Sequence, residues 1–146
     1  MTDKQIKQLK AILQGHIDAT MEFDRSVSFF QAGGVRDFFL LLRNQHENHI
    51  EVLKVALENN GYAYEIEESF IGVIQKSLAD LRVYFADNKA KAALKNSRSV
   101  LRSLEKKYEK TIRLNYSNAI NTILVENMAQ VTSEKKDIIL FLKSQF

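Results

Sequence analysis

The sequence contains no cysteine and no proline, and it has only five glycines in 146 residues. Without cysteine the chain has no disulfide, no thiolate metal ligand and no thiolate nucleophile, and it suits a reducing, cytoplasmic setting. Without proline, and with so little glycine, long helices can run uninterrupted. These absences favour an all-α protein.

Long apolar runs are missing as well. No window approaches 18 consecutive apolar residues, and Met1-Thr2-Asp3-Lys4 leads into an amphipathic pattern that lacks the apolar core of a signal peptide. We therefore expect neither a transmembrane segment nor secretion. A hydrophobic content of 45% is enough for one core of ordinary size, so we expect a single domain over residues 1–146.

Apolar residues recur every three or four positions along most of the chain, as they do on one face of a helix. The pattern predicts long helices over residues 2–32, 35–60 and 89–115, a last helix that Ser117 caps and whose seam runs from Ile120 to Phe141, and a shorter helix over 70–86 with Ser69 as its N-cap. Short turns at Gly33-Gly34 and Asn59-Asn60-Gly61 would reverse the chain. We predict an antiparallel four-helix bundle in which the 70–86 helix is the crossover between the second and third long helices.

The apolar seams turn polar near the middle of three of these helices. If the helices pack side by side, these polar residues meet in one central layer, to which Thr20 and Asn127 contribute uncharged groups. The residues at the seam positions are His16, Thr20, His46, His49, Asn127 and Glu134.

A di-iron site in such a bundle needs two Glu-x-x-His pairs, because residues i and i+3 point inward together. Leu13, Arg43 and His46 precede the three histidines by three positions, so the sequence does not encode this site. His46 and His49 remain a possible pair for iron, zinc or another divalent ion, with His16, Asp18, Glu22 or Glu134 as third ligand. We favour a polar core without a cofactor and keep the metal site as the alternative.

Four segments resemble the uncharacterised bacterial ferritin-like four-helix proteins, a family of unknown function. They are LKAILQGHIDATMEF, HENHIEVLKVALENNGY, ESFIGVIQKSLADLRVYF and SVLRSLEKKYEKTI, in the family's order. The resemblance implies a ferritin-like bundle with a crossover and, in many relatives, interior Glu and His side chains. This chain departs at Thr20 and Leu101, where relatives are acidic, and at Lys135 or Lys136, where they carry His. The departures put metal chemistry in doubt for this member.

Other functional motifs are missing. The sequence has no G-x-S-x-G, no P-loop and no G-x-G-x-x-G, so we predict that the protein is not an enzyme. Residues 87–114 hold nine Lys or Arg and three Asp or Glu. We interpret these cations as spread around their helix with Glu105 and Glu109 between them. Such a helix favours a solvated face, or contact with the acidic half of a partner subunit, over nucleic-acid binding.

Four aromatic residues, Phe29, Phe30, Phe38 and Phe39, flank the Gly-Gly turn. They are expected either to pack on the crossover helix or to cover a neighbouring subunit or ligand. Together with the resemblance, the sequence predicts a non-catalytic, ferritin-like accessory protein, interaction- or stress-associated, in a bacterial cytoplasm and assembled as a homodimer. The alternative is a metal-binding or redox protein that uses His46, His49 and a carboxylate.

Overall fold

A computed structural model of the chain describes residues 1–31, 33–63 and 88–145. It contains four helices and, within these ranges, no strand: α1 (Asp3–Ser28), α2 (Gly34–Asn59), α4 (Lys89–Ile112) and α5 (Asn118–Gln145). The predicted all-α class is confirmed. The predicted 70–86 helix, with its cap at Ser69, lies outside the described residues.

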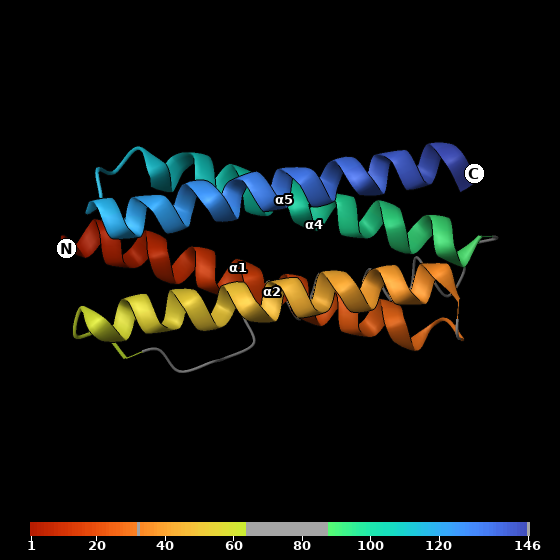
Figure 1. Cartoon of the computed structure of the whole chain (residues 1–146), viewed down its shortest axis with the longest axis horizontal. Helices are drawn as coiled ribbons and strands as arrows, with labels where there is room; N and C mark the ends of the chain where they lie inside the picture. Colours follow the sequence, from red (N-terminus) through yellow and green to blue (C-terminus); the bar gives the residue numbers. More distant parts are fainter. Residues whose placement is uncertain (32, 64–87, 146) are drawn as a thin grey trace.

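The four helices lie side by side along one long axis (Figure 1). Helix α1 packs against both α2 and α4, and α4 packs against α5, whereas α2 and α5 touch only sparsely. Around the bundle the order is therefore α2, α1, α4, α5, with one loosely closed side between α2 and α5. In the part of the chain that the structure describes, no helix is both long enough and apolar enough to span a bilayer.

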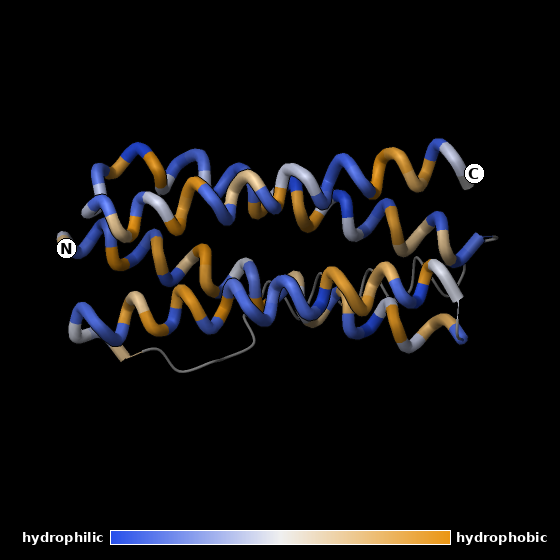
Figure 2. Tube along the Cα trace, viewed as in Figure 1, coloured by the Kyte–Doolittle hydropathy of each residue, from blue (hydrophilic) through white to orange (hydrophobic). Residues whose placement is uncertain are grey.

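Each helix presents one apolar stripe to a common core, and Figure 2 shows hydrophobic turns alternating with hydrophilic ones along all four. The α4 and α5 seams are buried as their spacing predicts, except that Phe141 stays half-buried. In α2 the buried seam ends on Leu57, while Ala56 turns toward α5. The largest fully buried side chains include Tyr108, Phe23, Phe39, Leu9, Leu13, Leu42, Leu94 and Leu101.

Helix α1 begins with a capping box and ends earlier than predicted. The Thr2 hydroxyl accepts from the Gln5 amide, and the Gln5 side chain accepts from the Thr2 amide. The predicted end at residue 32 is wrong, because α1 stops at Ser28 and Phe29 is its C-cap. Beyond this end of the helix, the Phe30 ring stacks on Phe39 at 6.1 Å between centroids.

The aromatic residues at the Gly-Gly turn pack on the bundle itself. Phe30 stacks on Phe39, and Phe38 stacks on Phe141 of α5 at 5.5 Å. This pairing joins the start of α2 to the end of α5. Part of the predicted apolar excess at this turn is therefore buried within the chain.

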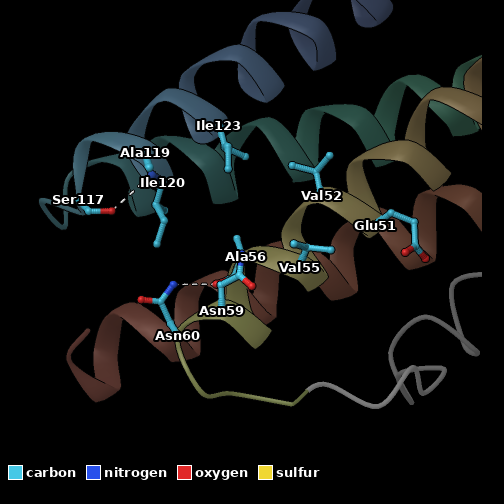
Figure 3. A pocket seen from close by; sticks show the side chains of 10 residues that line it. All are labelled: Glu51, Val52, Val55, Ala56, Asn59, Asn60, Ser117, Ala119, Ile120 and Ile123. Atoms are coloured by element: carbon cyan, nitrogen blue, oxygen red, sulfur yellow. Dashed lines mark hydrogen bonds between the residues drawn. The ribbon is translucent and has the colours of Figure 1, made fainter.

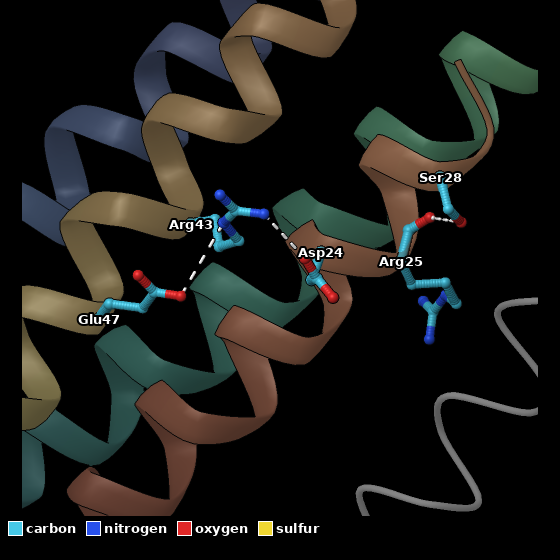
Figure 4. Close-up of polar contacts among 5 residues, drawn as sticks. All are labelled: Asp24, Arg25, Ser28, Arg43 and Glu47. Carbon is cyan, nitrogen blue, oxygen red and sulfur yellow. Dashed lines mark hydrogen bonds and ion pairs between the residues drawn. The ribbon is translucent and has the colours of Figure 1, made fainter. Parts of the chain in front are cut away.

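Polar contacts tie neighbouring helices together at their edges. Arg43 of α2 reaches Asp24 of α1 at 2.9 Å and Glu47 at 3.9 Å, and next to this pair the Ser28 hydroxyl donates to the Arg25 carbonyl (Figure 4). Between α4 and α5, Glu105 accepts from Thr132 and Lys135, both at 2.6 Å. Exposed pairs of this kind each stabilise a fold by no more than about 1 kcal/mol, so they fix register more than they add stability.

Most cations of residues 89–113 lie on one side of α4, which corrects the interpretation that they are spread around the helix. At about 100° of rotation per residue, one group falls within about 40° of Arg102 on the side facing away from the core. Its members are exposed or half-exposed: Lys91, Lys95, Arg98, Arg102, Lys106 and Arg113. We call this set the α4 basic stripe. Lys107 points the other way and lies close to Gly15 of α1.

Candidate functional site: a buried histidine centre

Polar side chains from all four helices meet in the middle of the core. His16 comes from α1, His46 and His49 from α2, Tyr108 from α4, and Asn127 and Glu134 from α5. His16, His46 and Tyr108 are fully buried, and the other three are at most 6% exposed. We call these six residues the histidine centre.

Helical spacing accounts for the arrangement. His46 and His49 are three positions apart, so they lie on one face of α2, and His16 occupies the matching seam position on α1. The three imidazole rings lie 4.9 to 5.7 Å apart between centroids. The Phe23 ring covers His46 at 5.2 Å, which seals the layer with an apolar group.

A continuous chain of hydrogen bonds runs through the centre. Asn127 Nδ2 donates to the Tyr108 hydroxyl at 3.2 Å, and this hydroxyl in turn bonds to His16 Nε2. His16 Nδ1 and His46 Nδ1 share a hydrogen bond of 2.8 Å. His46 Nε2 closes the chain on Glu134 Oε2, also at 2.8 Å. Five side chains from four helices are thereby linked.

One placement of protons satisfies every bond in the chain. With both imidazoles neutral, the Tyr108 hydroxyl donates to His16 Nε2, His16 Nδ1 donates to His46 Nδ1, and His46 Nε2 donates to the Glu134 carboxylate. In the part of the chain that the structure describes, the reverse direction would leave the Tyr108 hydrogen without an acceptor. The centre is thus a directed network that ends on one carboxylate.

Burial shapes the acid–base behaviour of these groups. The pKa of His16 is lowered well below its usual value, first by burial and then by repulsion from His46, His49 and Lys107. Burial, followed by repulsion from His46, lowers the pKa of His49 to about 4, partly offset by a hydrogen bond with Asn127. Burial also raises the pKa of Tyr108. His16 and His49 are therefore neutral, and the phenol keeps its proton, at physiological pH.

Two atoms of the centre have no hydrogen-bond partner among the residues that the structure describes. They are His49 Nε2 and Glu134 Oε1, and both are buried. Ser97 on α4 and Thr20 on α1 also bury hydroxyl oxygens without a partner. Unpaired buried polar atoms cost free energy, so this layer is not fully satisfied.

The spacing of the imidazoles fits proton sharing better than metal sharing. Two nitrogen ligands at about 2.0–2.1 Å from one tetrahedral ion stand about 3.3 Å apart. His16 Nδ1 and His46 Nδ1 are 2.8 Å apart, and both ring nitrogens of His46 are engaged in hydrogen bonds. Among residues 1–31, 33–63 and 88–145, no group of three or more His, Cys, Asp or Glu side chains is arranged to hold a metal ion.

The sequence-predicted residues reach the centre unequally. The structure brings His16, His46, His49, Asn127 and Glu134 together, whereas Thr20 makes no hydrogen bond to any of them. Of the other proposed third ligands, Asp18 is half-exposed and Glu22 pairs with Arg25 on its own helix. The sequence pattern did not single out Tyr108, which is one of the buried residues of α4. A single phenol among aliphatic seam residues was the available signal, since a buried Tyr hydroxyl needs a partner.

A second feature lies on the loosely closed side of the bundle. An apolar groove of about 490 Å³ runs between the end of α2 and the start of α5, and Glu51 is its one charged lining residue (Figure 3). Val52 and Val55 on its wall are 37% and 49% exposed. The remaining apolar walls come from Ala56, Ala119, Ile120 and Ile123. We call this feature the α2/α5 groove.

Comparison with known proteins gives one match. No curated protein and no solved structure matches the chain. The model of a domain of unknown function, DUF2383, matches residues 4–114. The match includes His16, His46, His49 and Tyr108 and excludes the two α5 members of the centre. Since it covers most of the sequence, the chain belongs to the DUF2383 family.

Proposed function

We propose that this protein is a non-catalytic, antiparallel, ferritin-like bundle that acts as an accessory protein through its surface, and that its histidine centre is a degenerate metal site kept as a structural hydrogen-bond network. The proposed setting is a bacterial cytoplasm, in keeping with the cysteine-free sequence and the resemblance of its four segments.

The observation that carries this proposal is the sealing of the centre. Its six residues include every histidine of the chain, and none is more than 6% exposed. A general acid or base must come within hydrogen-bond reach of its substrate. Here the ring nitrogens of His16 and His46 are already hydrogen-bonded to Tyr108, to Glu134 and to each other.

The degenerate-site part of the proposal is supported by what occupies the positions where relatives are acidic or carry His. Leu101 fills the core at 0% exposed, where a carboxylate would be needed. Lys135 leaves the centre altogether and pairs with Glu105. A di-iron site needs four carboxylates and two histidines, and these substitutions remove members of that set.

Metal content tests this directly. We expect protein purified without a His-tag and without chelator to contain well under one equivalent of iron or zinc per chain, by elemental analysis. The same analysis after incubation with ferrous ion or zinc and removal of the excess should also stay substoichiometric. One tightly held equivalent after gel filtration would overturn the proposal.

The homodimer is proposed to form through the α2/α5 groove, because its α2 wall carries two solvent-exposed valines and its only charged lining residue is Glu51, so the apolar surface favours burial against an identical surface. Sedimentation equilibrium at tens of micromolar should give a dimer. Changing Val52 and Val55 to Lys should give a monomer, and Leu140→Lys, at another exposed apolar site, should leave the dimer intact. A native chain that is strictly monomeric would contradict this part.

A second candidate function is metal binding at His49 and Glu134 with His46. The specific observation in its favour is that His49 Nε2 and Glu134 Oε1 are buried without partners. His46 would have to turn away from His16 to join them, which breaks the 2.8 Å bond. Loss of bound metal in both His49→Leu and Glu134→Gln would establish this alternative.

A further inference from the structure

We propose that the α4 basic stripe binds the phosphate backbone of double-stranded nucleic acid without reading its sequence. The stripe is defined above by Lys91, Lys95, Arg98, Arg102, Lys106 and Arg113, and this surface is separate from the histidine centre and from the α2/α5 groove.

The geometry of the stripe is that of a line of charge. From Lys91 to Arg113 the stripe spans about 33 Å at 1.5 Å per residue. Successive cations follow one another by three or four residues up to Lys106, about one helical turn. Lys110 extends the positive surface along one edge, and Glu109 is the one acidic residue within the stripe. A regular line of cations matches a regular line of phosphates.

The flanking helices show that the surface is a line and not a plane. Helices α1 and α5 both pack against or beside α4, and each holds equal numbers of acidic and basic residues: four and four in α1, three and three in α5. Helix α4 itself holds eight Lys or Arg and two Glu. Anionic lipid headgroups also attract clusters of Lys and Arg on one helix, but a bilayer is flat and meets the neutral neighbouring helices as well. A single charged ridge favours a linear polyanion.

The uncharged residues beside the α4 basic stripe favour nucleic acid over protein as its partner. Among the described residues, the large hydrophobic side chains that are exposed lie at the N-terminus, on α2 and on α5, and none lies on α4. Protein interfaces are built around buried apolar or aromatic anchors and are depleted of Lys at their centre. Apart from Glu109, the exposed residues of the α4 face are small or polar residues and cations, which suits phosphate contact.

The same composition favours a duplex over a single strand. Proteins that hold single strands stack bases on aromatic side chains. The only aromatic residue of α4 is Tyr108, and it is fully buried in the histidine centre. A surface without an exposed aromatic side chain can bind phosphates but cannot stack on unpaired bases.

Fluorescence anisotropy with four probes tests this inference: a 20-base-pair DNA duplex, an RNA duplex of the same length, oligo-dT, and vesicles containing phosphatidylserine. We expect the native protein to bind duplex at low salt and to lose affinity with a slope of log Kobs against log salt near −4, for about four phosphates contacted. Binding to either duplex supports the inference. Equal or tighter binding to oligo-dT or vesicles, or no duplex binding at low salt, overturns it.

A matched pair of variants separates the stripe from general positive charge. The triple change K95Q/R102Q/K106Q removes three charges from the stripe, and R36Q/K54Q/K143Q removes three from α2 and α5. Lys, Arg and Gln have similar helix propensity, so both variants should keep the native circular dichroism and melting curve. We expect the first to weaken duplex binding at least about tenfold and to flatten the salt slope by about 2, with the second within about threefold. Equal losses in the two variants overturn the assignment to the stripe.

Discussion

At the scale of single residues, the two histidines of α2 have different roles although they share one helix face. His46 has both ring nitrogens engaged, one with His16 and one with Glu134. His49 leaves Nε2 without a partner among the described residues, and it stands outside the chain of hydrogen bonds that runs from Asn127 to Glu134. Identical residues three positions apart therefore carry unequal shares of the network.

Replacing each of these histidines by Leu should separate these roles. His46→Leu removes the partner of a buried carboxylate and should lower the free energy of unfolding by about 3–5 kcal/mol. His49→Leu removes an unpaired buried nitrogen and should change it by no more than about 1 kcal/mol in either direction. Urea denaturation of both variants measures the difference. Equal destabilisation would contradict the network as described.

Acidification should destabilise the fold through His16 and His49. Their pKa values are lowered in the folded state, so below about 6.5 the unfolded chain binds more protons and stability falls with pH. Between pH 7.5 and pH 5.5 we expect a loss of roughly 1 kcal/mol per histidine, with a plateau above pH 7.5. Below the folded pKa of about 4, His49 adds no further loss.

The check is urea denaturation across this pH range for native protein and His49→Leu. The variant should lose about half of the pH dependence, because one of the two titrating rings is gone. Stability that rises on acidification, or a variant with an unchanged pH profile, would show that the rings are not held neutral.

At the scale of elements, the start of α1 also fixes the turn between α4 and α5. Gln5 completes the capping box with Thr2, and its Nε2 donates to the carbonyls of Leu114 and Asn115 at 2.7 and 3.2 Å. The Tyr116 hydroxyl donates back to the Gln5 carbonyl at 2.8 Å. Asn115 adopts a left-handed backbone at φ +56°, which this clamp holds in place. Two segments 110 residues apart thus share one cap.

Gln5→Ala should therefore cost more than an ordinary surface change. We expect it to lower the free energy of unfolding by about 1–2 kcal/mol, because it removes half of the capping box and the tie to the turn. Gln8→Ala, one turn further along α1, should change it by less than about 0.5 kcal/mol. Thermal melts followed by circular dichroism measure both. A cost for Gln8→Ala as large as that for Gln5→Ala would rule out the clamp.

Sequence periodicity predicted the seams well and the helix ends less well. Leu94, Leu101 and Leu104 follow a 3/4 spacing that only helix burial explains, so their placement needed no tertiary information. The end of α1 is followed by the contact of Phe30 with Phe39 across the turn, and the spacing of residues within one helix does not predict such a contact. The role of Tyr108 could not be predicted for a related reason. A seam position predicts that a side chain is buried, but it does not predict which residue the side chain contacts.

At the scale of the whole molecule, the chain separates a closed interior from two open surfaces. The histidine centre joins all four helices through one network, whereas the α2/α5 groove and the α4 basic stripe lie on different sides of the bundle. Because α1 and α5 each hold equal numbers of acidic and basic residues, the positive surface is confined to the α4 basic stripe. The proposed dimer surface and the proposed nucleic-acid surface therefore both lie outside its core.

The most direct test of the central claim is the melting temperature of the native chain with and without divalent metal. If the histidine centre is a structural hydrogen-bond network, excess zinc or ferrous ion should leave the melting temperature within about 1 °C of the value in chelator. A metal site would instead stabilise by about 2.7 kcal/mol at one hundred times its dissociation constant, a rise of several degrees. A rise of that size, absent from both His49→Leu and Glu134→Gln, would contradict the account.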